Sequence, residues 1–209
     1  GSVINMGFDF VFYGNTYNQV VLASNNYLSF NIANANQYCD YTIDAAIPTN
    51  LEPATQNGIL CPWQDIYPGA NGNGTIQYAT IGEAPNRVFI ASFCGIPMYS
   101  CTDVCYSSQI KLYESTSIIE THIAQKVLCQ AWNDGAAIHG LHNEDGTIAL
   151  VKLNYDSCEY DNVLDELEED GMATGDYNSE GGWRLVGFQR EDCNHQSPRT
   201  RSRCALSFR

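Results

Sequence analysis

The stretch that decides the fold runs from residue 7 to residue 30 and reads GFDFVFYGNTYNQVVLASNNYLSF. Apolar residues alternate with polar ones in FDFVFYG, and the runs QVVLAS and YLSF follow after the short segments NTYN and NN. Alternation with a period of two is typical of strands that bury one face, and Asn and Gly favour the turns between them. The stretch therefore predicts three strands. It holds no acid, base or nucleophile in a catalytic arrangement.

Similar runs continue along most of the chain. Segment 34–60 is expected to be irregular because it contains Pro48 and Pro53, and 162–171 is the one stretch with a helical pattern. Further strand-like runs cover 75–82, 87–100, 108–115, 117–128, 136–142, 147–155 and 181–188. Strands of this length joined by hairpin turns predict an all-β fold, an antiparallel β-sandwich or jelly roll stabilised by disulfides.

Charge divides the chain into an acidic body and a short basic tail. The 209 residues carry a net charge of −14; residues 1–189, the expected sandwich domain, hold about −17, and the C-terminal tail 190–209 holds about +3. A domain with this much negative charge repels nucleic acid and anionic membranes. We therefore expect neither of them as a partner. No apolar run is long enough to span a bilayer, and we expect no membrane insertion. The tail is expected to dock on its own domain or on a neighbouring subunit.

Nine cysteines are dispersed through the sequence, and no two of them form a CxxC pair. Dispersed cysteines in an acidic β protein indicate disulfides formed outside the cytoplasm, and hence an extracellular or cell-surface location. Nine is odd, so at least one thiol is expected to be free or paired between chains, and Cys94, in the apolar run VFIASFCGI, is expected to be a buried thiol. We expect Cys101 or Cys105 to pair with Cys129; the rest of the connectivity is open. The disulfide candidates are Cys39, Cys61, Cys101, Cys105, Cys129, Cys158, Cys193 and Cys204.

Catalytic and metal-binding patterns are scarce. No HExxH, GxSxG or Gly-rich phosphate loop occurs, so no catalytic or cofactor-binding residue is predicted. The acidic cluster between Asp156 and Asp170 offers oxygen ligands for calcium but lacks the spacing of a calcium loop. A solvated acidic face is the favoured interpretation, and the question of a metal stays open.

Two features suggest contact with glycans. Asn73 lies in the only N-x-[ST] sequon, in an expected exposed turn, and is the candidate glycosylation site. Aromatic side chains could form a platform on which sugars stack, although most are expected to belong to the core or to strand surfaces. These residues are Tyr13, Tyr17, Tyr27, Trp63, Tyr67, Trp132 and Trp183.

Several phrases of the sequence together resemble a known family. They are MGFDFVFYGNTYNQVVLASNNYLSF, ILCPWQDIYPG, the run from IQYATIGEAPNR to NEDGTIAL, and GGWRLVGF. Their order resembles the β-sandwich domain of secreted Bacteroidota surface proteins, which are gliding-motility-associated or adhesin-like and leave the cell by type IX secretion. The opening phrase is also similar to that of nidogen-type extracellular domains. The resemblance covers about residues 3–189 and implies no catalytic residues. Its most specific part is the joint occurrence of four motifs: APNR, LYE, Cys-x-x-Trp-Asn-x-Gly and the closing Trp-Arg.

Three functions are weighed. The favoured hypothesis is a self-assembling subunit of an extracellular filament or coat, a homo-oligomer or homopolymer, in which the strand-like end CALSFR of the tail adds to a neighbour's sheet edge. The alternative is an adhesin-like module whose loops bind a glycan or a protein. A glycan-active enzyme ranks last, because its two carboxylates would have to face each other, whereas the acids cluster in one run. The expected assembly residues are Arg199, Arg201, Arg203, Leu206 and Phe208.

Overall fold

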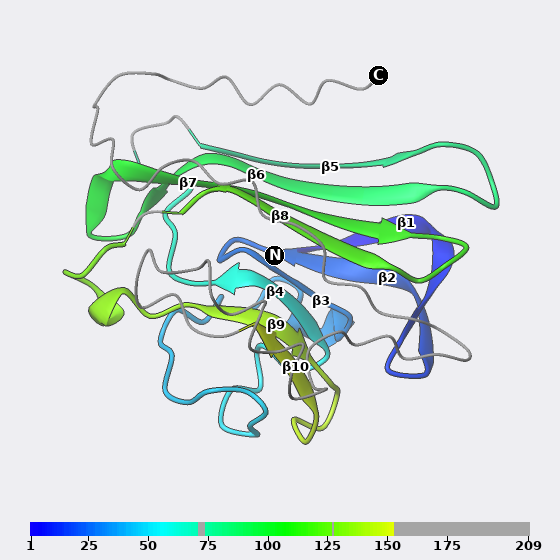
Figure 1. The fold of residues 1–209 in the computed structure, drawn as a ribbon, viewed down its shortest axis with the longest axis horizontal. Helices are drawn as coiled ribbons and strands as arrows, with labels where there is room; N and C mark the ends of the chain where they lie inside the picture. The colour runs from blue at the N-terminus through cyan, green and yellow to red at the C-terminus, as the bar shows by residue number, and fades with distance from the viewer. Residues whose placement is uncertain (71–73, 127, 153–209) are drawn as a thin grey trace, which may run out of the picture.

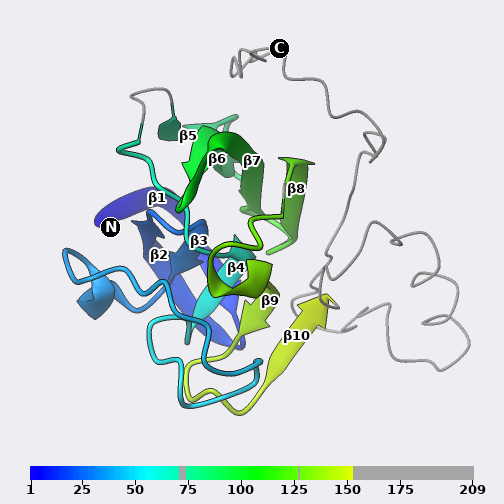
Figure 2. The same ribbon diagram turned by 90° about the vertical axis from the view of Figure 1, so that its left-hand side faces the viewer.

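Two antiparallel β-sheets pack face to face in the computed structural model, which describes residues 1–70, 74–126 and 128–152 (Figures 1 and 2). The first sheet has the strand order β1-β2-β3-β4-β9-β10 and the second the order β5-β6-β7-β8. The strands of the first sheet are β1 (Ser2–Phe12), β2 (Asn15–Ala23), β3 (Tyr27–Ser29), β4 (Gly58–Trp63), β9 (Ile138–His142) and β10 (Ala149–Lys152). Those of the second are β5 (Thr75–Ile81), β6 (Val88–Met98), β7 (Cys101–Tyr113) and β8 (Ile119–Gln125), and the two short 3-10 helices are η1 (Ile32–Asn34) and η2 (Asn133–Gly135). The predicted all-β sandwich is confirmed.

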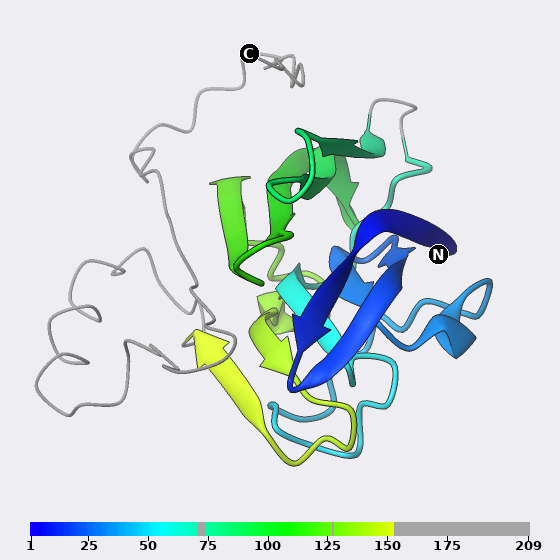
Figure 3. The same ribbon diagram turned by 90° about the vertical axis from the view of Figure 1, so that its right-hand side faces the viewer.

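The core lies between the two sheets, and β1 shows why the opening stretch specifies it. Every second residue of β1 from Ile4 to Phe12 is buried, as the alternation of the sequence requires. Phe10 and Phe12 pack against the ring of Phe30, which follows β3, with centroids 5.9 and 4.6 Å away. From the second sheet the core receives Phe89, Phe93, Ile96, Tyr106, Ile110 and Leu112. Seen from the end with the β1–β2 hairpin, the two layers lie one above the other (Figure 3).

The Asn25-Asn26 turn between β2 and β3 is buried and links the two sheets. Asn26 has a positive φ of 64°, which Asn tolerates better than most residues, and its amide nitrogen donates to the Pro62 carbonyl (2.8 Å) and the Tyr106 hydroxyl (2.7 Å). Ser108 of the second sheet donates to the Asn26 side-chain oxygen at 2.8 Å. The turn residue that the sequence marks is thus a fully bonded polar group inside the core.

Strand β4 was not expected, because segment 34–60 reads as irregular and Pro62 interrupts the run. All six residues of β4 are buried, so the strand lacks the alternation that reveals a half-exposed one. Its pairing with β9 shifts register between Leu60 and Trp63, and the proline is accommodated there. The rest of the segment is largely irregular, and Ile47 of this loop packs with Tyr27, Leu60 and Trp63 in a second apolar cluster.

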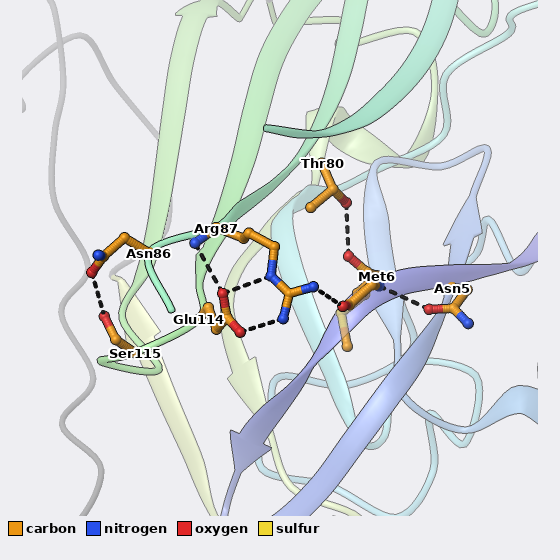
Figure 4. A network of polar contacts seen from close by, with 8 residues as sticks. Asn5, Met6, Thr80, Asn86, Arg87, Glu114 and Ser115 are labelled. Carbon is orange, nitrogen blue, oxygen red and sulfur yellow. Dashed lines mark hydrogen bonds and ion pairs between the residues drawn. The ribbon is translucent and has the colours of Figure 1, made fainter. Parts of the chain in front are cut away.

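A polar contact network, the Arg87 staple, joins β1 to the second sheet and consists of Arg87, Glu114 and Gly7 (Figure 4). β1 bulges where its pairing with β2 shifts register between Asn5 and Phe10, and Gly7 has a φ of 86° there. The Arg87 guanidinium donates to the Gly7 carbonyl and to both Glu114 carboxylate oxygens, with Nε to Oε2 at 2.8 Å. Nearby, the Thr80 hydroxyl donates to the Met6 carbonyl at 2.7 Å. The phrases MGFDF, APNR and LYE therefore meet at one point, where they hold the sheets together.

The predicted pairing of Cys129 with a loop cysteine is confirmed, since Cys101 and Cys129 form a disulfide. Cys101 and Cys105 do not bridge each other, because the sulfur of Cys101 is bonded to Cys129 and Cys105 is a free thiol. The expectation of a free thiol at Cys94 was wrong: Cys94 is disulfide-bonded. Its neighbour Phe93 points into the core, so the side chain of Cys94 lies on the opposite face of β6, partly exposed.

Three other cysteines were wrongly expected to form disulfides. Cys39, Cys61 and Cys105 are free thiols. Cys61 is buried among apolar side chains, and its Sγ donates to the Gln109 carbonyl (3.8 Å), whereas Cys39 Sγ lies against the Tyr27 hydroxyl (3.7 Å). Burial raises the pKa of the Cys61 thiol to about 12, so it stays protonated and unreactive.

The remaining sequence predictions lie outside the described residues. They concern Asn73, the helix at 162–171, the strand at 181–188, the acidic cluster and the basic tail with Arg199, Arg201, Arg203, Leu206 and Phe208, together with Cys158, Cys193 and Cys204. In the part of the chain that the structure describes, no helix has the length and apolar character needed to cross a membrane.

Candidate ligand-binding site

Five aromatic rings form a continuous row, the aromatic strip, at the end of the sandwich that holds the β6–β7 turn and η2, on the left in Figure 1. The rings follow each other in the order Tyr38, Tyr41, Trp132, Tyr99 and Tyr67, with centroid distances of 5.8, 5.9, 4.7 and 5.9 Å. Tyr38 is 74% exposed, Tyr67 46% and Tyr99 41%. Exposed aromatic rings gathered in one place are typical of recognition surfaces.

Four separate loop segments supply the strip, and specific bonds hold them together. The Tyr67 amide donates to the Pro97 carbonyl (2.7 Å), and the Tyr99 amide donates to the Asp65 carbonyl (3.3 Å), so the loop after β4 lies along the end of β6. The Asn133 side chain donates to the Tyr41 carbonyl at 2.7 Å. These bonds give the strip a fixed scaffold although its rings come from loops.

The disulfide fixes the position of Trp132. Cys101 begins β7, next to the turn that carries Tyr99, and Cys129 precedes Trp132 by three residues. The Cys129 sulfur lies 3.4 Å from the Tyr99 carbonyl oxygen. The covalent bond therefore holds the Trp132 loop against the β6–β7 turn.

A small pocket, the Gln64 pocket, lies at this end of the molecule. It is lined by Gln64, Asp65, Tyr99, Trp132 and Asn133, among others, and has room for about one water-sized group. Gln64 is 2% exposed, and within the residues that the structure describes neither its amide nitrogen nor its amide oxygen has a hydrogen-bond partner. Trp132 Nε1 is also buried and has no partner at full hydrogen-bond geometry among those residues, although it lies near the Asp65 carboxyl. Each buried polar group left without a partner costs about 1–3 kcal/mol, so the pocket is costly to the fold.

The carboxyl of Asp65 at the pocket is electrostatically perturbed. Partial burial raises its pKa to about 6, and the nearby Trp132 indole N–H offsets part of that rise. A carboxyl in this state readily accepts a hydrogen bond from a ligand, because few solvent contacts compete for it. Perturbed groups of this kind gather at functional sites.

His139 and His142 lie elsewhere and have structural partners. His139 Nε2 is 2.9 Å from the Thr121 hydroxyl, and His142 is within 3.3 Å of Thr49 and Thr55; both imidazoles are buried. Burial lowers the pKa of His142 and favours its neutral form. Within residues 1–70, 74–126 and 128–152, no three His, Cys, Asp or Glu side chains lie close enough together to hold a metal ion.

Seven aromatic residues were considered for a sugar platform, with most of them expected in the core or on strand surfaces, and the described part of the chain places Tyr67 and Trp132 on the strip. Tyr27 and Trp63 are core residues, Tyr13 and Tyr17 pack against the main core, and Trp183 lies outside the described residues. Sequence reasoning missed Tyr38, Tyr41, Tyr99, Gln64 and Asp65. One signal was available, because the phrase ILCPWQDIYPG contains Gln64, Asp65 and Tyr67, and the Cys-x-x-Trp-Asn-x-Gly phrase contains Trp132.

Comparison with known proteins identifies a family for this chain. No curated protein and no solved structure matches the chain. A sequence model of the NIDO-related family matches residues 1–170, which include both sheets, the Arg87 staple and the aromatic strip. The match covers well over half of the 209 residues. The chain therefore belongs to the NIDO-related family.

Proposed function

We propose that this protein is a non-enzymatic, extracellular, adhesin-like module that binds a glycan or protein ligand through its aromatic strip. The observation that carries the proposal is the strip itself. It joins rings from four loop segments into one partly exposed row, next to polar groups that have no partner in the fold. Aromatic side chains offer large contact areas with little conformational entropy to lose, and for this reason they dominate many binding surfaces.

The setting of the strip supports a role in recognition. The strip tyrosines Tyr38, Tyr67 and Tyr99 are exposed, whereas every phenylalanine among the described residues is buried. A disulfide fixes one of the loops, as expected of a protein that works in an oxidising environment. Secretion by a bacterium of the Bacteroidota through the type IX system is part of this proposal, and it rests on the sequence resemblance alone.

The proposal is tested by screening the full chain against an array of immobilised glycans and extracellular matrix proteins. Hits are repeated with the double variant Tyr67→Ala/Tyr99→Ala and with Tyr78→Ala as the matched control. Tyr78 is a comparably exposed tyrosine on β5, and its ring contacts Phe89 and none of the rings of the strip. The double variant is expected to lose at least about tenfold in affinity, the usual effect of removing central aromatic contacts. Equal binding by all three proteins would exclude the strip as the binding surface.

A second candidate function, self-assembly into an extracellular filament or coat, is favoured by the β5 edge. β5 is the outermost strand of the second sheet, it pairs only with β6 among the described residues, and Tyr78 and Ile81 on it are exposed. An exposed edge of seven residues can accept a strand from another copy. We propose the basic tail, with Arg199, Arg201 and Arg203, as that connector.

Deletion of residues 190–209 tests the assembly function. Electron microscopy of the intact chain at modest salt is expected to show polymers that are absent from the deleted form. Polymers that survive the deletion would exclude the tail as the connector. Monomers in both samples would leave binding through the strip as the function.

A further inference from the structure

The Gln64 pocket has an unusual set of hydrogen-bonding groups for a site inside a fold. The Gln64 amide offers both donors and an acceptor, Trp132 Nε1 offers one donor, and the Asp65 carboxyl offers an acceptor. Donors and acceptors thus line the same small space. Two of the three side chains have buried polar atoms without a partner in the described part of the chain.

The chemistry of these groups restricts the ligand. A hydroxyl group both donates and accepts, so it can bond to Trp132 Nε1 or the Gln64 amide nitrogen and at the same time to Asp65 or the Gln64 oxygen. An ammonium or guanidinium group only donates, and it would leave the Gln64 amide nitrogen without an acceptor. An anion would meet the Asp65 carboxyl inside a protein of net charge −14.

The size of the pocket points in the same direction. It accepts about one water-sized group, so a hydroxyl or the end of a hydroxymethyl group enters, whereas a sugar ring does not. The ring would remain outside. There the exposed face of Tyr99, 4.7 Å from Trp132 between ring centroids, offers the apolar contact that the C–H face of a pyranose requires.

From these contacts we infer that the Gln64 pocket is a subsite for one hydroxyl group of a neutral saccharide whose ring stacks on the aromatic strip. The inference rests on the proposed function, since it assigns a ligand class to the same surface. Gln64 and Asp65 determine specificity, and Tyr99 and Tyr67 supply the stacking surface. The unpaired amide is the cost of keeping this subsite open, a common conflict between stability and function.

Substitution of Gln64 by Leu separates binding from folding. Leu has a similar size and no polar atoms, so Gln64→Leu should raise the melting temperature while it lowers the affinity for a neutral saccharide at least about tenfold. The probes are laminarin and yeast α-mannan as neutral polymers, polygalacturonate as an acidic one and an arginine-rich peptide as a cation. Titration calorimetry on the full chain gives the affinities. Asp65→Asn is the second variant, and Tyr78→Ala is the control with expected wild-type binding.

The outcomes distinguish the inference from the function beneath it. Loss of binding in Tyr67→Ala/Tyr99→Ala with full binding in Gln64→Leu would retain the strip and overturn the hydroxyl subsite, because the pocket then holds only water. Preference for polygalacturonate or the cationic peptide, or no binding of either neutral polymer, would overturn the neutral ligand class. Full binding in the Tyr67→Ala/Tyr99→Ala variant would overturn the proposed function itself.

Discussion

The two ends of the sandwich are built from different kinds of contact, although the same strands β6 and β7 reach both. At one end, Arg87 precedes β6 and Glu114 follows β7, and the Arg87 staple pairs the guanidinium with the Glu114 carboxylate and the Gly7 carbonyl. At the other end, the β6–β7 turn carries Tyr99, a disulfide replaces the ion pair, and the Gln64 pocket contains unpaired polar atoms. The Arg87 staple thus pairs its polar groups with each other, whereas the Gln64 pocket has buried polar atoms without a partner among the described residues.

This difference indicates how stability and recognition are divided in the molecule. A polar network with all partners present serves the fold, and nothing further is needed to explain it. Polar atoms that stay buried and unpaired weaken the fold and so point to a partner that the fold does not contain. The staple end therefore serves the architecture, and the aromatic end is where we propose that a ligand binds.

The largest expected effect comes from removing the disulfide at the aromatic end. The double variant Cys101→Ser/Cys129→Ser opens a loop of 28 residues and should lower the free energy of unfolding by about 3 kcal/mol. Ligand binding should weaken as well, because Trp132 loses its anchor. Chemical denaturation measures the first effect and calorimetry the second. Cys105→Ser, a free thiol on the same strand, is the control; a stability loss no larger than its own would contradict the prediction.

A smaller effect is expected from breaking the staple. Arg87→Ala leaves the Glu114 carboxylate and the Gly7 carbonyl without their partner, so the melting temperature should fall by a few degrees while ligand binding stays unchanged. Lys111→Ala is the matched control, because the Lys111–Glu120 pair is long at 3.9 Å and should contribute little. An equal fall in both variants, or weakened binding in Arg87→Ala, would remove the proposed division between the two ends.

The smallest effect, on the pH dependence of stability, has opposite signs at the two ends. Hydrogen bonding to Arg87 lowers the pKa of Glu114. The ionised Glu114 carboxylate therefore stabilises the fold above about pH 4.5, and this stabilisation is lost as the pH falls. Burial raises the pKa of Asp65 from 3.8 to about 6, because the folded state favours the protonated carboxyl. Protonation of Asp65 therefore favours the folded state fully below about pH 4, and this stabilisation is lost as the pH rises toward 6. Melting curves between pH 3.5 and 7.5 should therefore show Asp65→Asn equal to wild type near pH 4 and more stable above pH 6. Glu114→Gln should be less stable than wild type at neutral pH and approach it at the acidic limit. If the melting temperatures of Asp65→Asn and Glu114→Gln, each relative to wild type, changed in the same direction with pH, the opposite pKa shifts of the two carboxyls would be contradicted.

The sequence predicted the parts of this structure that follow from local patterns. The alternation in GFDFVFYG gives β1, and Asn25-Asn26 gives the turn after β2. The segment NTYN was wrongly expected to be a turn: it belongs to β2, and the turn before that strand is Tyr13-Gly14. The pairing of Cys129 with a loop cysteine also followed, because adjacent strands bring the two segments together. Strand β4 could not be found in this way, since a strand buried on both faces shows no alternation.

The candidate site was harder to predict because its residues come from loops that only the tertiary structure brings together. Tyr38 and Tyr99 are 61 positions apart in the sequence, and neither lies in a recognisable motif. The free state of Cys39, Cys61 and Cys105 likewise depends on which sulfurs face each other in space, and a count of cysteines cannot show this.

The Cys101–Cys129 bond also sets how the molecule responds to mechanical force. Strands β7 and β8 both lie inside the closed loop, so tension that enters through β6 passes directly across the sulfur bridge to the Trp132 loop. The segment between Cys101 and Cys129, which is about 90 Å long when its 28 residues are fully extended, cannot lengthen when the two ends of the chain are pulled apart. A pull on the backbone cannot unzip β7 from β8, and the two loops that carry Tyr99 and Trp132 stay joined until a covalent bond breaks.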